Sequence, residues 1–443
     1  MIELLRRADA ASPAVVTSDG ATTYGELVAR AEAVAAALHE RGVRRFAIIN
    51  ADAATVAALL AGASLAGAEA CQYPPDDELS EIAARFDHSL AVTRLRPLPD
   101  RLHGVDPDEL RGAQAPADPP ARRPLLVLTT GTTGTPRGVL HDWNRLLRGT
   151  RRIAPAPGER WLLAYGLHQF AGLQMLLHVF AAGATLVAPA LRRPREGLAA
   201  VRAHGVTHAS ATPTYWRFLL AELRADGGPV PALQQITLGG EAVPAPVLAE
   251  LASAFPGAKL SQVYAASEFG SSGSVRDGRS GLALDVLERS DDADVAMKIV
   301  DSELWVRSRV GMLGYYGEEP IDDPDGWRPT GDLVDVVDDR IVFRGRTSDV
   351  INVGGVKVHP LPIEDRVGAV PGVDVVRVFG RPNPMTGAIV AVEIVPAPDT
   401  DQDTLREAIR AACEDLPAPS RPRSVKFVES VSMAGDKIVR RAT

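Results

Sequence analysis

The sequence contains few cysteines, and few of its basic residues are lysines. Cys71 and Cys413 are the two cysteines in 443 residues, and they stand far apart with no metal-ligand spacing around them. They predict free thiols in a reducing, cytoplasmic compartment. Of the 48 basic residues five are lysines, so the position of each lysine is informative.

Long apolar runs and basic clusters are also missing. The longest apolar-leaning stretch, "VAALLAGASLAGA", falls short of the roughly 20 residues that a bilayer span needs. The first residues contain no apolar segment typical of a signal peptide. The net charge is −8 and Lys/Arg residues form no long run. We therefore expect neither a membrane partner nor a nucleic-acid partner.

The chain instead shows alternating helical and strand-like patterns. Through the first 270 residues, short apolar runs such as "RFAIIN", "WLLAYG" and "QQITLGG" alternate with segments of helical periodicity. This order predicts an α/β fold with mostly parallel sheets covered by helices. Residues 96–123, rich in proline, arginine and aspartate, predict a surface connection.

The pattern changes twice farther along the chain. After Ser271 the strand-like runs lie close together and predict a small β-rich subdomain, and from about Asp349 a shorter α+β pattern begins. We predict a large N-terminal domain over residues 1–345, a hinge at 346–348, and a small mobile α+β C-terminal domain over 349–443.

One stretch, "VLTTGTTGTPRGVLH" at residues 127–141, concentrates threonine and glycine after an apolar run. Glycines let backbone N–H groups turn toward a ligand, and threonine hydroxyls add further donors. Together they predict an anion site suited to phosphate. The spacing G-x-x-x-x-G-K-[ST] of a P-loop is absent. Taken alone, the stretch is also compatible with a flexible surface loop.

Nine stretches follow one another along the chain: "TTYGELV", "LTTGTTGTPRGV", "GLHQFAGL", "THASATPTYWRFLL", "ITLGGEAVP", "QVYAASEFG", "GWRPTGDLV", "FRGRTSDVINVGGVKVHPLPIE" and "SMAGDKIVRR". In this order they resemble the motifs of the adenylate-forming (ANL) superfamily of acyl-CoA synthetases, aryl acid ligases and nonribosomal adenylation domains. The chain looks like a shortened member.

The resemblance implies that ATP is bound. The phosphates are expected at the threonine–glycine loop, the adenine at a glycine turn, and the ribose at an aspartate and an arginine. The implied nucleotide residues are Thr129, Thr130, Gly131, Thr132, Thr133, Gly134, Arg137, Gly239, Gly240, Glu241, Tyr264, Ala265, Ser267, Asp332, Arg346 and Lys437.

Catalytic roles follow from the same resemblance. Lys437 stands in the position of the adenylating lysine, and a flexible ammonium can bridge two oxyanions as charge develops. Glu268 is the implied Mg²⁺ ligand, and Thr130 and His168 are further implied catalytic residues.

The chain departs from the family at several motif positions. Ala265 and Ser267 replace glycine and threonine, Arg137 replaces lysine, Asp436 replaces glycine, and Ser348 stands at the hinge.

The acid is the less determined part. His168 matches the aromatic gate beside the acyl pocket, and aromatic residues nearby suggest an aryl or other compact acid. The implied substrate residues are His168, Phe170, Gly172, Tyr215, Gly239 and Tyr264, with Tyr165 and Trp216 close by in the sequence. Aromatic residues at these positions are equally compatible with the core.

The implied reaction has two steps. The acid carboxylate attacks the α-phosphate of ATP, pyrophosphate leaves, and the acyl adenylate passes to the thiol of CoA or of phosphopantetheine on an acyl carrier protein. Gly355 and Lys357 resemble the turn that enters the site for the second step. Two alternatives remain open: a diazo-forming enzyme of the same family that uses nitrite and an aryl amine, and a catalytically degenerate nucleotide-binding member.

Overall fold

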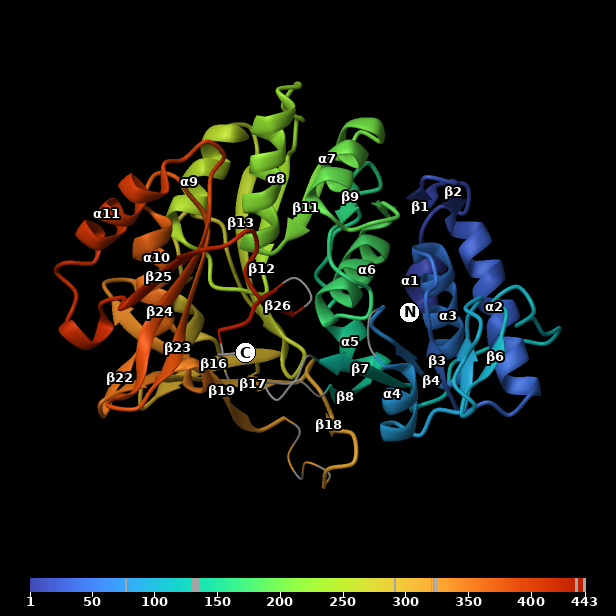
Figure 1. Cartoon of the computed structure of the whole chain (residues 1–443). Helices are drawn as coiled ribbons and strands as arrows, with labels where there is room; N and C mark the ends of the chain where they lie inside the picture. Colours follow the sequence, from blue (N-terminus) through green and yellow to red (C-terminus); the bar gives the residue numbers. More distant parts are fainter. Residues whose placement is uncertain are drawn as a thin grey trace.

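The protein is described from a computed structural model, in which the chain forms a large N-terminal unit and a smaller C-terminal unit (Figure 1). The structure describes residues 1–75, 78–129, 136–290, 292–319, 321, 323, 325–434 and 437–440, without the side chains of Ala434 and Lys437. Within these residues, no helix is both long enough and apolar enough to cross a membrane.

A seven-stranded sheet carries the N-terminal part of the large unit. Its order is β18-β8-β7-β4-β3-β5-β6, parallel from β7 to β6, with β8 and β18 added antiparallel. The bounds are β3 (Arg45–Ile48), β4 (Glu69–Gln72), β5 (Leu90–Val92), β6 (His103–Val105), β7 (Pro124–Thr129), β8 (Arg137–Asp142) and β18 (Gly314–Tyr315). The prediction of a plain surface connection over 96–123 is wrong at β6. Backbone pairing with β5 forms this short strand without an alternating apolar pattern.

An eight-stranded sheet lies beside it, in the order β14-β13-β12-β11-β9-β10-β1-β2, parallel from β13 to β1. The bounds are β1 (Pro13–Thr17), β2 (Gly20–Thr23), β9 (Arg160–Leu163), β10 (Thr185–Val187), β11 (His208–Ala211), β12 (Gln235–Gly239), β13 (Lys259–Ala266) and β14 (Gly270–Val275). Parallel strands end at one edge of a sheet, which is where α/β folds bind ligands. The segments after β9, β11, β12 and β13 therefore meet at that edge.

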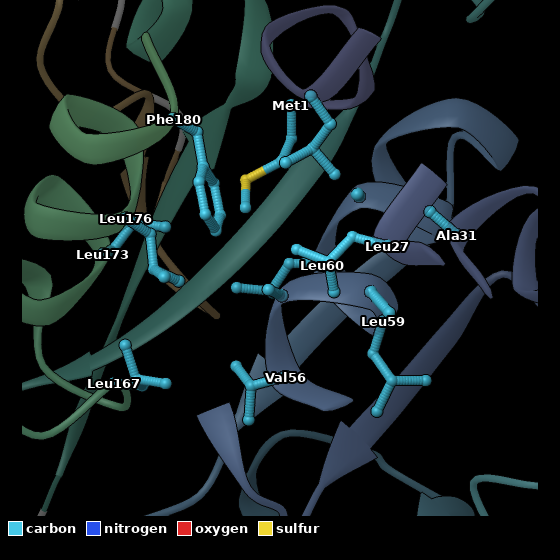
Figure 2. Close-up of a cluster of buried hydrophobic side chains, with 14 of the residues drawn as sticks. Met1, Leu27, Ala31, Val56, Leu59, Leu60, Leu167, Leu173, Leu176 and Phe180 are labelled. Carbon is cyan, nitrogen blue, oxygen red and sulfur yellow. The ribbon is translucent and has the colours of Figure 1, made fainter. Parts of the chain in front are cut away.

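Helices pack between and around the two sheets. They are α1 (Ile2–Arg7), α2 (Tyr24–Glu40), α3 (Ala53–Ala66), α4 (Leu79–Arg85), α5 (Trp143–Arg148), α6 (Phe170–Ala182), α7 (Pro194–Ala203), α8 (Pro213–Asp226) and α9 (Ala245–Ala254). Figure 2 shows side chains of α3, including Val56 and Leu60, facing Leu173, Leu176 and Phe180 of α6. Because α3 is apolar nearly all round, it lies fully inside this core.

A third, antiparallel sheet forms the predicted β-rich part. Its order is β15-β20-β19-β17-β16, with β15 (Leu282–Ala283), β16 (Val295–Val300), β17 (Glu303–Ser308), β19 (Trp327–Val337) and β20 (Arg340–Arg346). A 3₁₀ turn over Thr347–Asp349 follows β20 directly. The hinge at 346–348 thus falls where β20 ends, and its motion stays a prediction.

The small unit has its own sheet and core. It contains β21 (Ile351–Val353), β22 (Val356–Val358), β23 (Val373–Asn383), β24 (Gly387–Pro396), β25 (Ser424–Phe427), α10 (Pro360–Gly368) and α11 (Gln402–Ala412). The last segment leaves this unit and returns to the middle of the molecule as the ribbon β26 (Met433–Ala434) and β27 (Lys437–Ile438) (Figure 1). The predicted fold class, a large α/β unit with a β-rich part and a small α+β unit, is confirmed.

Candidate active site

Three of the predicted nucleotide residues meet at one carboxylate. The register of β19 and β20 places Asp332 opposite Arg346, and Arg346 Nε donates to Asp332 Oδ1 at 3.0 Å. The hydroxyl of Tyr264, near the end of β13, donates to Asp332 Oδ2 at 2.6 Å. A carboxylate held this way at a strand edge can accept hydrogen bonds from the vicinal hydroxyls of a ribose. We call Tyr264, Asp332 and Arg346 the ribose corner.

Charge stabilises the ribose corner. The Asp332 carboxylate raises the pKa of Arg346, although partial burial opposes the shift. Burial raises the pKa of Tyr264 and the adjacent Asp332 carboxylate raises it further. The phenol therefore stays protonated at neutral pH and remains a donor.

A small cleft adjoins the ribose corner. Its wall includes Glu241 and Tyr264, as predicted, together with Ala242, Val342 and Phe343. The Tyr264 ring packs between Phe269 and Phe343, with ring centroids 5.6 Å and 5.1 Å away. The glycine turn after β12 enters the same region, and Gly240 has a φ of 84°, which favours glycine. The cleft has the flat apolar wall that a purine ring requires.

Glu268 is fixed from both its backbone and its side chain. The register of β13 and β14 shifts between Tyr264 and Ala265, and the chain then turns through Ser267 to Glu268. Met312 N donates to the Glu268 carbonyl oxygen at 2.9 Å, and Tyr315 Oη donates to Glu268 Oε1 at 3.0 Å. Sequence reasoning missed Tyr315, whose one visible signal is the aromatic pair in "GYYG".

The donor set at Glu268 fits a magnesium–nucleotide complex. Where the chain is described, no group of three or more His, Cys, Asp or Glu side chains is placed to hold a metal ion. Mg²⁺ commonly takes one or two carboxylates and completes its shell with phosphate and water oxygens. One partly exposed carboxylate within electrostatic reach of Arg137 suits that arrangement.

The strands that flank the threonine–glycine loop are well defined. Thr129 at the end of β7 pairs with Arg137 at the start of β8, and Thr129 Oγ1 donates to the Arg137 carbonyl oxygen. The Arg137 guanidinium lies 3.6 Å from the Tyr315 ring centroid and 2.5 Å from Glu318 Oε1. The loop residues predicted to bind phosphate, Thr130, Gly131, Thr132, Thr133 and Gly134, lie outside the described residues.

Three of the predicted acid-side residues, His168, Phe170 and Gly172, lie after β9. A side chain on Gly166 would lie 2.4 Å from the His168 ring, and one on Gly172 would lie 2.2 Å from the Gly166 carbonyl oxygen. Both glycines therefore permit close packing of this turn. Tyr165 Oη donates to the Gly239 carbonyl oxygen at 3.4 Å, which joins the turn to the end of β12.

Phe170 is buried at the start of α6 and stacks on His141 of β8, with ring centroids 5.1 Å apart. Full burial lowers the pKa of His141 to about 3, with Arg145 adding to the shift and the Ser267 backbone opposing it. His141 is thus neutral, and its ring contact with Phe170 joins β8 to the start of α6. No motif in the sequence pointed to it.

Tyr215 and Trp216 lie on α8 in a core cluster. A side chain on Gly197 of α7 would come within 2.0 Å of Tyr215 Oη, and Trp216 Nε1 donates to the Thr237 carbonyl oxygen. Trp216 is fully buried. The contact of Tyr215 with an acid stays a prediction.

The C-terminal segment reaches the cleft. Ile438 N donates to Glu241 Oε1 at 3.3 Å, so the backbone of the neighbouring Lys437 lies beside the glycine turn. The side chain of Lys437 lies outside the described part. Gly355 and Lys357 lie on the β21–β22 hairpin, where β22 appears at the outer edge of the small unit in Figure 1.

Comparisons with known proteins identify the family of the chain. The profile of the AMP-binding enzyme family matches residues 6–316, and that of the AMP-binding enzyme C-terminal domain matches residues 362–435. The feruloyl-CoA synthase of an Amycolatopsis species is 26% identical, covering 97% of this chain and 95% of its own. The fatty acid–[acyl-carrier-protein] ligase MmaC of Mycobacterium marinum is 29% identical, covering 68% of this chain and 63% of its own.

Solved structures share the fold. The anthranilate CoA ligase AuaEII, in complex with anthranoyl-AMP, has a TM-score of 0.86 and 21% identity, covering 99% of this chain and 95% of its own. The o-succinylbenzoate CoA synthetase of Bacillus subtilis, in complex with its acyl adenylate, has a TM-score of 0.78 and 21% identity, covering 99% and 96%. With profiles of both family domains matching in order along the chain, this protein belongs to the AMP-binding enzyme family of adenylate-forming ligases.

Proposed function

We propose that this ligase activates an aryl or other compact carboxylic acid with ATP and passes the acyl group to the thiol of CoA or of phosphopantetheine on an acyl carrier protein. The observation that carries the proposal is the ribose corner beside the apolar cleft. Related proteins named for aryl acids, a feruloyl-CoA synthase and an anthranilate CoA ligase, support the acid class. A relative named as an acyl-carrier-protein ligase keeps the second acceptor in view.

The nucleotide is expected to lie across the edge of the eight-stranded sheet. The adenine would lie in the cleft beside Glu241 and Ala242, and its ribose hydroxyls would donate to Asp332. Arg137 and the threonine–glycine loop would bind the β- and γ-phosphates. Glu268 would hold Mg²⁺, and a bound Mg²⁺ supplies positive charge that neutralises the phosphates.

The first step forms one bond and breaks another at the α-phosphorus. A carboxylate oxygen of the acid attacks that phosphorus, and pyrophosphate leaves with the electron pair of the broken P–O bond. The Lys437 ammonium would bridge the carboxylate and the α-phosphate and stabilise the growing charge. Positioning and electrostatics supply the catalysis, because no protein nucleophile is needed.

The second step transfers the acyl group. A thiolate attacks the carbonyl carbon of the acyl adenylate, and AMP leaves with the oxygen that joined the acid to phosphorus. The hairpin with Gly355 and Lys357 is the expected partner of this step, and it would have to move to the cleft from its present place on the small unit.

The relatives named for aryl acids favour a compact acid. The turn after β9 carries three of the residues predicted to contact it, namely His168, Phe170 and Gly172. His168 packs against Gly166, and Gly172 lies close to the Gly166 carbonyl oxygen, so both glycines allow this turn to be tight.

The test is pyrophosphate release from ATP over a panel of aryl, fatty and amino acids, with nitrite included. We expect release with aryl acids, and a loss of about a hundredfold or more in Lys437→Ala, since removing one stabilising charge typically costs that much. The exposed Lys426→Ala on β25 is the matched control and should retain the rate. Comparing CoA with a phosphopantetheinylated carrier protein then identifies the acceptor.

Release with no acid, or undiminished release in Lys437→Ala, would contradict the proposal. Release that depends on nitrite and an aryl amine would replace it by diazo formation.

A further inference from the structure

The carboxylate of Glu241 joins the large unit to the C-terminal segment. Thr212 caps α8 by accepting from Tyr215 N, and this cap presents Thr214 toward Glu241. Thr214 donates to Glu241 Oε2 from both its backbone N, at 3.2 Å, and its Oγ1, at 2.7 Å. The other oxygen, Oε1, accepts from Ile438 N at 3.3 Å. One carboxylate thus fixes the peptide bond between Lys437 and Ile438.

A second carboxylate holds the segment two residues later. Arg440 Nε donates to both oxygens of Glu364 on α10, at 3.0 Å and 2.9 Å, and its terminal nitrogen lies 2.7 Å from Oε2. Glu364 is 5% exposed and also accepts from Val378 N at 2.9 Å. Although burial opposes it, Glu364 raises the pKa of Arg440, so the guanidinium stays charged.

The residue between these two contacts is held as well. The Val439 carbonyl accepts from Arg377 Nε, and Val439 N donates to the Ser432 carbonyl oxygen at 3.0 Å. Arg377 is itself buried and paired with Glu393 at 2.7 Å. Each of the three residues after Lys437 therefore has a fixed partner.

One of these contacts crosses the boundary between the units: Glu241 belongs to the large unit and Ile438 to the small unit. The pair of Glu364 with Arg440 and the contacts of Val439 lie within the small unit. A small pocket lies at the boundary, with Thr214, Arg217 and Glu241 on the large unit and Glu364, Asp365 and Arg440 on the small unit. Buried charged pairs contribute directional constraint more than net stability. The Glu364–Arg440 pair would therefore move with the small unit, whereas the contact of Ile438 N with Glu241 would form in one docked position.

We propose that Glu241, Glu364 and Arg440 form a seat that positions Lys437 for adenylation: Glu364 and Arg440 hold the segment within the small unit, and Glu241 docks it against the large unit. All three are positioning residues, because they act through the backbone that carries Lys437. The inference rests on the proposed function, since Lys437 acts in the first step. A misplacement of about 1 Å can cost about a hundredfold in rate, so small changes at the seat should be measurable.

The two steps are measured separately in Arg440→Ala and Glu364→Gln. ATP–pyrophosphate exchange reports adenylation, and thioester formation from a synthetic acyl adenylate reports transfer alone. We expect Arg440→Ala to lose about tenfold or more in exchange and to keep its transfer rate within about twofold. Arg440→Lys should recover part of the exchange. Arg366→Ala is the matched control. Arg366 lies on α10, as Glu364 does, but its ion pair is with Asp415, away from the C-terminal segment.

Hydrogen exchange tests the seat without any acid. In Glu241→Ala, the amides of residues 438–440 should exchange several-fold faster than in the wild-type protein. The amides of α10 should exchange at the wild-type rate. Equal loss of both steps in Arg440→Ala, no loss in either, or unchanged amide exchange in Glu241→Ala would overturn the seat. If the wild-type protein adenylates no acid, the proposed function fails, and amide exchange still decides on the seat.

Discussion

The ribose corner and the seat of the C-terminal segment are built in different ways. Asp332 and Arg346 are 14 residues apart on adjacent strands of one sheet, and Tyr264 joins them from the neighbouring sheet of the same unit. Glu241 and Ile438 are 197 residues apart and belong to different units. The first group is preassembled by strand register, whereas the second exists in one placement of the small unit. Under the proposed function, the ribose corner holds AMP through both steps, which suits a group that does not depend on where the small unit lies. Lys437 acts in the first step alone, which suits a contact that forms in one placement of the small unit.

Asp332→Asn should give the largest effect of the changes that separate the two groups. It removes the charge that Arg346 and Tyr264 contact and the acceptor for the ribose. Hydrogen bonds to a charged group contribute about 1.5–3 kcal/mol each, so kcat/KM for ATP should fall about a hundredfold. Both half-reactions should fall, because each holds the same ribose. If Asp332→Asn slowed adenylation alone, as is expected of Arg440→Ala, the predicted difference between the ribose corner and the seat would be contradicted.

Tyr315→Phe should have an intermediate effect. It removes the hydrogen bond to Glu268 and leaves the ring beneath Arg137. We expect about a three- to tenfold loss of pyrophosphate exchange, with a higher Mg²⁺ concentration needed for half-maximal rate. Tyr316→Phe is the control, since Tyr316 bonds to Arg45 instead. An unchanged Mg²⁺ dependence in Tyr315→Phe would argue against the placement of Glu268 at the metal.

Asp365→Asn, next to the seat residue Glu364, should give the smallest effect. Enclosure by protein raises the pKa of Asp365 to about 6, Glu364 adds to the shift, and Arg217 and Arg440 oppose it. The docked position therefore favours protonated Asp365, and this preference is lost as pH rises through about 6. Asp365 still reaches solvent. The exchange rate of Asp365→Asn relative to wild type should thus rise by about twofold at most between pH 5 and pH 8. A ratio that is flat or falls with pH would contradict this.

Much of the ribose corner could be predicted from the sequence, because its residues belong to ordered motifs and strand register brings them together. Asp332, Arg346 and Tyr264 were expected near one ligand and do meet. The large and small units and their fold class followed from the alternating patterns. Short strands without an apolar pattern, such as β6, did not.

The rest depends on tertiary placement that no local pattern encodes. Tyr315 reaches Glu268 because β18 adds to the edge of β8, and His141 meets Phe170 because α6 begins beside β8. Glu241 was expected at the adenine through its backbone turn. Its side chain accepts hydrogen bonds from Thr214 on α8 and from Ile438 in the C-terminal segment. The second contact depends on how the two units are placed, which no local sequence pattern encodes.

The central claim is that a carboxylate oxygen becomes bonded to the α-phosphorus of ATP. The most direct measurement uses an aryl acid that is accepted by the enzyme and labelled with ¹⁸O in its carboxylate, followed by mass spectrometry of AMP after transfer to a thiol. The account predicts AMP that carries one ¹⁸O atom, since the bridging oxygen stays with phosphorus when the thioester forms. Unlabelled AMP, or ADP in its place, would contradict it.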